Sequence, residues 1–155
     1  MTGLIIGIFL KLFVIDILHV SGISMEPSIH DNSVVFVNKL AYGLILPQSA
    51  KLAFQWAKPH YGDVVIFLYN NRIVVKRCDA VGGEHLDYLT DSGYSLRVGK
   101  RKIPLTEEQY FRLKNSRRVP DGYILAIGDN YGQSIDSRYY GFIPVNNVLG
   151  KVIGK

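Results

Sequence analysis

Residues 62–78 have the sequence GDVVIFLYNNRIVVKRC, which predicts a β-hairpin. Val64–Tyr69 is rich in β-branched and aromatic residues, which favour a strand, and residues 73–78 continue the same composition. Asn70 and Asn71 between them suit a tight hairpin turn. Lys76 therefore lies in a strand whose neighbours are typical of a protein core.

Further strands are predicted on both sides of this hairpin, so the pattern is mainly β. One helix is expected over residues 106–113, with Thr106 as its N-cap and acidic residues in its first turn. The segment 40–59 carries apolar groups, including Phe54 and Trp56, which indicate either a flap that touches a membrane or ordinary loop packing. The other predicted strands are 33–38, 94–98, 102–105, 123–127 and 148–153.

The chain has 155 residues, enough for one domain with a real core. Its net charge of +5 favours anionic surfaces but is too diffuse to indicate nucleic acid, and no nucleic-acid partner is expected. Cys78 is the only cysteine, which excludes an intrachain disulfide and a cysteine-based metal site. Neither a metal nor a cofactor is expected.

Residues 3–20 are the membrane candidate. As one helix they would run about 27 Å, close to the thickness of a hydrocarbon core. Lys11 and Asp16 interrupt this run, and a charge at mid-bilayer costs about 2.5 to 3.5 kcal/mol. We therefore expect a short apolar helix that ends near Lys11, followed by an interfacial stretch. The alternative is a buried N-terminal element of a soluble domain.

Residues 21–29, SGISMEPSI, set Ser24 on a glycine-flanked bend. A serine hydroxyl is a weak nucleophile that needs a base, and Lys76 is the candidate. Neutralising a free lysine at pH 7 costs about 4.6 kcal/mol, but burial lowers a lysine pKa by up to about 3 to 5 units. Two alternatives stay open: a solvent-facing Lys76, and a triad that uses one of His19, His30, His60 and His85.

Four ordered motifs resemble the signature boxes of bacterial type I signal peptidases. The resemblance implies a membrane-anchored serine endopeptidase on the signal-peptidase/LexA-like antiparallel β fold. Such an enzyme cleaves precursor proteins after small residues of the Ala-x-Ala type, on the outer face of the cytoplasmic membrane. The implied partners are signal-peptide-bearing precursors and membrane lipid, and a monomer is expected. The motifs are Ser24-Met25-x-Pro27, 62–67, Lys76-Arg77 and Gly128-Asp129-Asn130 with Ser134-x-Asp136-Ser137-Arg138 and Gly141.

The resemblance also implies the roles of single residues. Ser24 would be the nucleophile, Lys76 the general base, and Ser134 the residue that holds the lysine amine. The Ser24 backbone N–H would be the first oxyanion donor. One branch of the family has a serine as second donor where this chain has Gly22, so the second donor is a backbone group or a water.

Three further residues belong to the last box: Asp136 and Arg138 would form a supporting ion pair, and Asp129 would be a structural member. This box departs from the common Arg-Asp-Asn pattern at Tyr131-Gly132-Gln133. By motif position, the shallow pockets for small side chains would be lined by Leu18, Val20, Ile29, Val35, Ile66 and Val75.

The predicted division is an N-terminal anchor or interfacial segment over 1–20 and a β-rich catalytic domain over 21–155. Residues 79–121 would form a small excursion between the lysine box and the last box. Other readings stay open: a short, specialised enzyme that matures one pilin or conjugation protein, an inactive signal-peptide-binding relative, a non-enzymatic basic β module, and a LexA-type autoproteolytic regulator. The last should carry a helix-turn-helix, whereas the first 20 residues are apolar.

Overall fold

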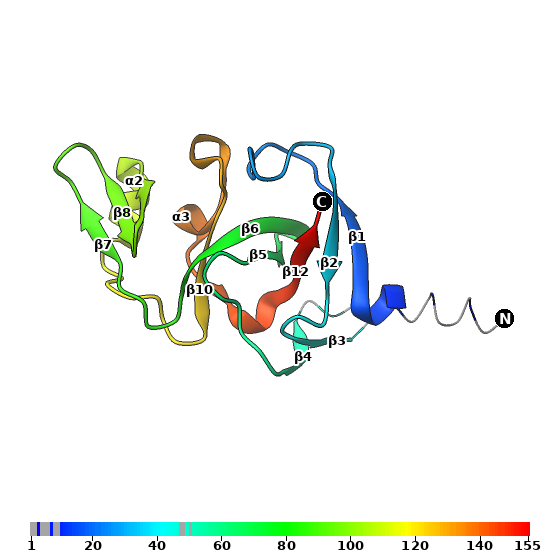
Figure 1. Cartoon of the computed structure of the whole chain (residues 1–155). Helices are drawn as coiled ribbons and strands as arrows, with labels where there is room; N and C mark the ends of the chain where they lie inside the picture. Colours follow the sequence, from blue (N-terminus) through cyan, green and yellow to red (C-terminus); the bar gives the residue numbers. More distant parts are fainter. Residues whose placement is uncertain (1–2, 4–6, 8–9, 47–48, 50) are drawn as a thin grey trace.

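A seven-stranded antiparallel sheet forms the body of the molecule (Figure 1). The structure is a computed structural model that describes residues 3, 7, 10–46, 49 and 51–155. The predicted mainly β fold class is confirmed. In spatial order the strands are β1 (Ile15–His19), β2 (Val34–Asn38), β12 (Val148–Gly154), β5 (Val64–Tyr69), β6 (Arg72–Val81), β10 (Tyr123–Ile127) and β11 (Ile143–Pro144).

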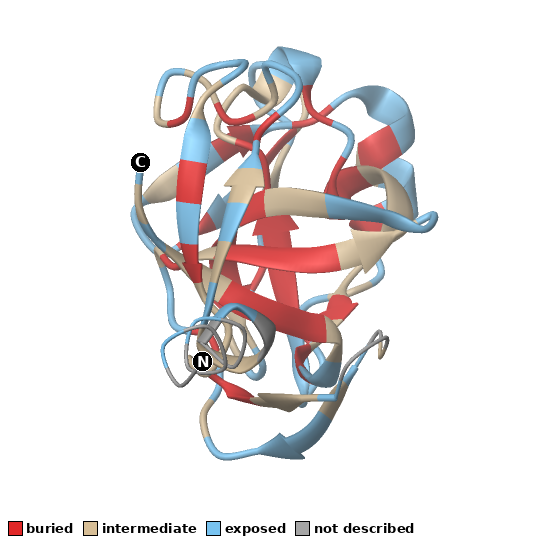
Figure 2. Cartoon of the chain, turned by 90° about the vertical axis from the view of Figure 1, so that its right-hand side faces the viewer, coloured by how far each residue is buried: buried red, intermediate tan, exposed pale blue. Residues whose placement is uncertain are grey.

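The predicted hairpin is the centre of this sheet. β5 and β6 pair in unbroken register from Val64 opposite Arg77 to Tyr69 opposite Arg72. Asn70 (φ 49°) in the turn adopts the left-handed backbone that asparagine tolerates, as does the residue after it. Figure 2 shows buried residues concentrated on the strands in the middle of the molecule.

β6 changes its neighbours along its length. Residues 72–77 pair with β5, whereas only residues 77–81 pair with β10. In the described part of the chain, residues 72–76 therefore have a strand on one side only. Lys76 is the last residue of this open edge.

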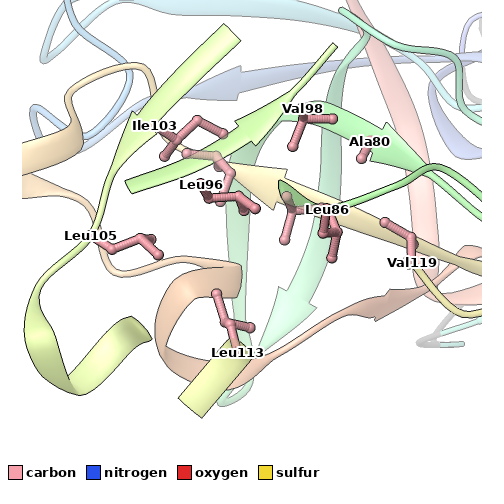
Figure 3. Close-up of a cluster of buried hydrophobic side chains, with 10 residues drawn as sticks. Ala80, Leu86, Leu96, Val98, Ile103, Leu105, Leu113 and Val119 are labelled. Atoms are coloured by element: carbon pink, nitrogen blue, oxygen red, sulfur yellow. The ribbon is translucent and has the colours of Figure 1, made fainter. Parts of the chain in front are cut away.

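A second, three-stranded sheet is built from the excursion. It contains β7 (Asp87–Leu89), β8 (Ser95–Val98) and β9 (Arg101–Pro104), and is followed by α2 (Glu107–Leu113). α2 begins at the predicted N-cap, Thr106, which forms a capping box with Gln109. Figure 3 shows the buried side chains of this part pointing toward one another, and Leu125 and Ile127 of β10 belong to the same cluster. The excursion therefore shares a core with the main sheet.

Several short elements were not expected from the sequence. β7 spans three residues, and α3 (Ser137–Tyr140) spans four, although only one helix was predicted. Both are too short to show a periodic pattern. α3 begins where the Asp136 carboxylate accepts a hydrogen bond from the backbone N–H of Arg138, so its start depends on a side-chain cap.

The chain enters the sheet earlier than expected. A π-helix, η1 (Leu10–Val14), precedes β1, and all five residues of β1 pair with β2. Residues 15–19 therefore lie in the sheet, although they were assigned to the N-terminal segment; β-branched residues such as Ile15 and Ile17 favour this extended backbone. Most of the expected short helix before Lys11 lies outside the described residues. Among the described helices, none is long and apolar enough to cross a membrane.

The segment 40–59 forms a separate small hairpin. β3 (Gly43–Ile45) pairs with β4 (Leu52–Gln55). Phe54 is 68% exposed and Trp56 is 59% exposed. The indole N–H of Trp56 donates to the carbonyl oxygen of Leu40, so the ring is held in place at the surface. Contact of this hairpin with a membrane stays a prediction.

Candidate active site

Ser24 and Lys76 meet although 52 residues separate them. Ser24 lies in the turn between β1 and β2, and Lys76 lies near the middle of β6. The Lys76 Nζ is 2.7 Å from the Ser24 Oγ, and the lysine is only 4% exposed. In the described part of the chain, no hydrogen bond joins Ser24 Oγ to a histidine. The lysine is therefore the base in contact with this hydroxyl.

Burial changes the proton affinity of Lys76. Loss of hydration lowers its pKa from the usual 10.5 to about 8. The Asp136 carboxylate acts in the opposite direction, Arg138 adds to the depression, and Asp129 opposes it. A substantial fraction of the amine is therefore neutral near pH 8, where it can accept a proton.

The turn that carries Ser24 is held by the last box. The backbone N–H of Asn130 donates to the Ser24 carbonyl oxygen at 3.0 Å, and its side-chain amide donates to the carbonyl oxygen of Ile23 at 3.1 Å. Met25 is 1% exposed and anchors the turn in the core. Asn130 was not among the predicted site residues, although its place beside Asp129 in the motif was the available signal.

Gly128 lets these two segments approach closely. A Cβ at this position would lie 2.6 Å from the carbonyl oxygen of Ser24 and would overlap the hydroxyl of Ser134. No side chain larger than hydrogen fits there.

Gly128→Ala is expected to destabilise the fold by about 1 to 3 kcal/mol, because the added methyl overpacks a closed space, and to impair cleavage by moving the Ser24 turn. Urea denaturation and initial rates on a precursor measure the two effects. Gly132→Ala is the matched control, since nothing lies within 4 Å of a Cβ at that position. Equal behaviour of the two variants would contradict the role given to Gly128.

The predicted ion pair of the last box is present and buried. Arg138 Nε lies 2.9 Å from Asp136 Oδ1 and Nη2 lies 2.8 Å from Oδ2, while the residues are 2% and 0% exposed. Asp136 Oδ2 also accepts the backbone N–H of Gly128 at 3.0 Å. Two parallel charge-assisted bonds fix the orientation of both side chains.

Asp129 forms a second bidentate pair, with Arg77. Arg77 Nε and Nη2 lie 2.8 and 2.6 Å from the two carboxylate oxygens, and the guanidinium also reaches Ser28 Oγ at 3.2 Å. This pair links β6 to both the last box and the Ser24 turn. Arg77 was quoted in the lysine motif but was not among the predicted site residues.

Ser134 does not make its predicted contact. The residue is 4% exposed, but its hydroxyl has no hydrogen-bond partner, and Lys76 donates to Ser24 instead. Its side chain packs against the backbone at Gly128. The expectation that Ser134 holds the lysine amine is therefore wrong for this structure.

Gly22 adopts a φ of 106°, in the region that favours glycine. Its N–H donates to Asp31 Oδ1 at 2.6 Å, so this group is already engaged. In this structure the Gly22 N–H is therefore not a free second donor for an oxyanion.

A groove of about 900 Å³ opens beside Ser24 and Lys76. Of the six predicted pocket residues, Leu18, Val20 and Val75 line it. The other three are not among its lining residues: they are 0 to 4% exposed and pack in the core cluster that also contains Leu18, Val20 and Val75. They are Ile29, Val35 and Ile66. Val35 lies opposite Leu18 in the β1–β2 pair and Ile66 lies opposite Val75 in the β5–β6 pair, so these two side chains share a face of the sheet with groove-lining residues and are covered by the packing of this cluster.

The described residues contain no group of three or more His, Cys, Asp or Glu side chains that could hold a metal ion. The polar groups beside Ser24 are instead paired with one another, as described above for Asp129 and Asp136.

The chain matches the family model "Signal peptidase, peptidase S26" over residues 1–154. It is 34% identical over 148 residues to signal peptidase I of Bacillus caldolyticus, covering 92% of this chain and 80% of that protein. It is 26% identical to signal peptidase I of Pseudomonas fluorescens, covering 96% and 66%. A crystal structure of a signal peptidase I from Enterococcus faecalis V583 aligns with a TM-score of 0.46 at 25% identity, over 62% of this chain and 97% of that one.

Matches of this extent define the chain as a serine peptidase, and hence a hydrolase. It belongs to the signal peptidase family, peptidase S26. The family predicted from the four sequence motifs is therefore confirmed.

Proposed function

We propose that this protein cleaves signal peptides from exported precursors with Ser24 as nucleophile and Lys76 as general base. The observation that carries the proposal is the 2.7 Å contact between Ser24 Oγ and the amine of a buried lysine. The family relationship supports the substrate class.

The reaction is acyl transfer in two halves. Neutral Lys76 accepts the Ser24 proton while Oγ attacks the scissile carbonyl carbon and its oxygen becomes an oxyanion. The intermediate collapses, the peptide C–N bond breaks, and the lysine ammonium protonates the leaving amine. Lys76, neutral again, then activates a water that hydrolyses the Ser24 ester and restores the hydroxyl. The Ser24 backbone N–H is the first donor to the oxyanion.

The groove suits an extended peptide. It lies between β1, an edge strand of the main sheet, and residues 72–76 of β6, whose second edge is open. A peptide that adds to such an edge gains backbone hydrogen bonds and presents alternate side chains to the wall. The apolar lining by Leu18, Val20 and Val75 supports a preference for small side chains of the Ala-x-Ala type.

The cytoplasmic membrane is the proposed location, with the catalytic domain on its outer face. The apolar run 3–20 includes β1, which carries exposed apolar side chains. The exposed Phe54 and Trp56 add a second apolar surface. The exposed apolar residues of the first two strands are Ile15, Ile17, Val34 and Phe36, at 43 to 61%.

The proposal is tested by incubating the purified protein with a precursor that carries an Ala-x-Ala site and mapping the cut by mass spectrometry. Cleavage after the second alanine is expected, and substitution of that alanine by a bulky residue should abolish it. No cleavage of any precursor, together with no labelling of Ser24 by an acylating serine probe, would overturn the proposal in favour of a binding role.

The pH–rate profile is expected to rise with a midpoint near pH 8, because the burial-lowered pKa of Lys76 is about 8 and only the neutral amine is a base. Between pH 8 and 10.5 the unfolded lysine binds more protons than the folded one, so Lys76 makes stability rise with pH in this window. Initial rates of cleavage across pH 6 to about 10 test the pH–rate profile, and urea denaturation midpoints over the same range test the pH dependence of stability. A rising limb near the free-lysine value of about 10.4 would contradict the buried base.

A further inference from the structure

Tyr131 connects the second sheet to the last box. Its ring lies near two guanidinium groups: the Cζ atoms of Arg101 and Arg138 are 5.7 and 5.6 Å from the ring centroid. Both distances are in the range of cation–π attraction. The phenol oxygen also accepts a hydrogen bond from Arg101. Arg101 begins β9, so this contact joins the excursion to the segment that carries Asp136 and Arg138.

On one side of this connection, Arg101 binds a buried residue of the main sheet. Arg101 Nη1 also binds Asp79 Oδ1, and Asp79, on β6, is 0% exposed. Its second carboxylate oxygen has no hydrogen-bond partner, and burial raises the pKa of Asp79 to about 7, whereas the charge of Arg101 acts to lower it. A buried carboxylate strongly favours keeping such a partner in place. Arg101 is therefore held on one side by Asp79 and presents its other nitrogen to Tyr131.

On its other side, Tyr131 is connected through Arg138 to the last box. Arg138 Nη2 donates to the carbonyl oxygens of Tyr131 at 2.9 Å and of Ser134 at 3.3 Å, and Nη1 donates to the carbonyl oxygen of Pro104, at the end of β9, at 3.3 Å. Arg138 thus fixes the backbone of the last box against the second sheet. The Asp136–Arg138 pair in turn acts electrostatically on Lys76.

We propose that Tyr131 is a positioning residue for the catalytic lysine: with Arg101 and Asp79 it holds the Asp136–Arg138 pair against Lys76. The inference rests on the proposed role of Lys76. It assigns the excursion a positioning role in the reaction, because Arg101 belongs to β9. It also gives a reason for Tyr131 at a place where the common pattern of the family has arginine.

Tyr131→Ala removes the ring that lies near both guanidiniums and is expected to let water approach the last box. Since burial is the largest cause of the lowered pKa of Lys76, hydration should raise that pKa, by about half a unit. The rising limb of kcat then moves to higher pH, and activity at pH 7 falls about threefold while activity near the alkaline plateau is retained. A merely structural role would lower activity equally at all pH values.

Two measurements make the test decisive. The pH–rate profile gives the pH at which kcat rises, and an NMR titration of the Lys76 side chain gives its pKa without any substrate. If the titration shifts but no precursor is cleaved, the proposed function fails, and what stands is the effect of Tyr131 on the pKa of Lys76. If precursors are cleaved but the Lys76 titration of Tyr131→Ala matches that of the unaltered protein, only this inference is overturned. Tyr123→Ala, an exposed tyrosine on β10, is the control and should leave the titration unchanged.

Milder variants cover the case in which Tyr131→Ala does not fold. Tyr131→Phe keeps the ring and removes the hydroxyl that binds Arg101, and Arg101→Ala removes the other partner. Because both act through one contact, the double variant should shift the Lys76 titration no more than Arg101→Ala alone. Additive shifts, or no shift in any of the three, would overturn the proposal.

Discussion

Replacing Lys76 by alanine is expected to lower kcat/KM for precursor cleavage by about 10³-fold or more, because the Ser24 hydroxyl then has no base within reach. Ser24→Ala, which removes the nucleophile, should cost at least as much. Since the two groups act as one unit, the double variant should be little worse than either single variant. Initial rates on one precursor, measured at pH 8 for all three variants, test this.

The control for Lys76→Ala is the substitution of an exposed lysine, which removes only a surface charge. Lys102 on β9 is exposed, and Lys102→Ala should cleave at the rate of the unaltered protein. Circular dichroism on each variant separates lost catalysis from lost folding. Retained cleavage by a folded Lys76→Ala protein would remove the lysine from the mechanism. It would also reopen the histidine alternative, for which His19 is the candidate that lines the groove.

Asp136→Ala is expected to destabilise the protein by about 3 to 5 kcal/mol, because it leaves the Arg138 guanidinium buried without its counter-charge. The same change removes the acceptor for the Gly128 N–H and the N-cap of α3. In a chain of this size the loss corresponds to a fall in Tm of roughly 6 to 20 °C. Urea denaturation and thermal melting give both values directly.

The exposed pair of Arg112 and Glu108 on α2 is the matched control. Its atoms are 2.9 Å apart, but the side chains are 50% and 71% exposed. Glu108→Ala should therefore cost no more than about 1 kcal/mol. If Asp136→Ala lowers the free energy of unfolding no more than Glu108→Ala does, burial of the Asp136–Arg138 pair does not increase its contribution to stability. Replacing both Asp136 and Arg138 by apolar residues should recover part of the stability, because no unpaired charge is left buried.

Local chemistry made several elements predictable. The β-branched run 64–69 and the two turn asparagines predicted the central hairpin, and Thr106 as N-cap predicted the start of α2. Such features depend on residues close together in the chain, so a single sequence reveals them. The motif positions likewise indicated Ser24, Lys76 and the Asp136–Arg138 pair before any geometry was known.

Other features depend on what packs around each residue. Ile29, Val35 and Ile66 have the residue types of a small apolar pocket, but they are buried in the core cluster to which the groove-lining residues also belong. The hydroxyl of Ser134 is turned to Gly128, and the N–H of Gly22 to Asp31, by contacts between distant segments. No local pattern could reveal these orientations.

The sequence by itself determined that this chain forms a β hairpin, carries the serine and lysine motifs, and belongs to the signal peptidase family. Only the tertiary structure decided the state of Lys76. Lysine is a base near pH 8 only when it is stripped of water, and hydration is set by the strands and loops that cover it. The 4% exposure and the 2.7 Å contact with Ser24 come from segments 52 residues apart, which the sheet brings together.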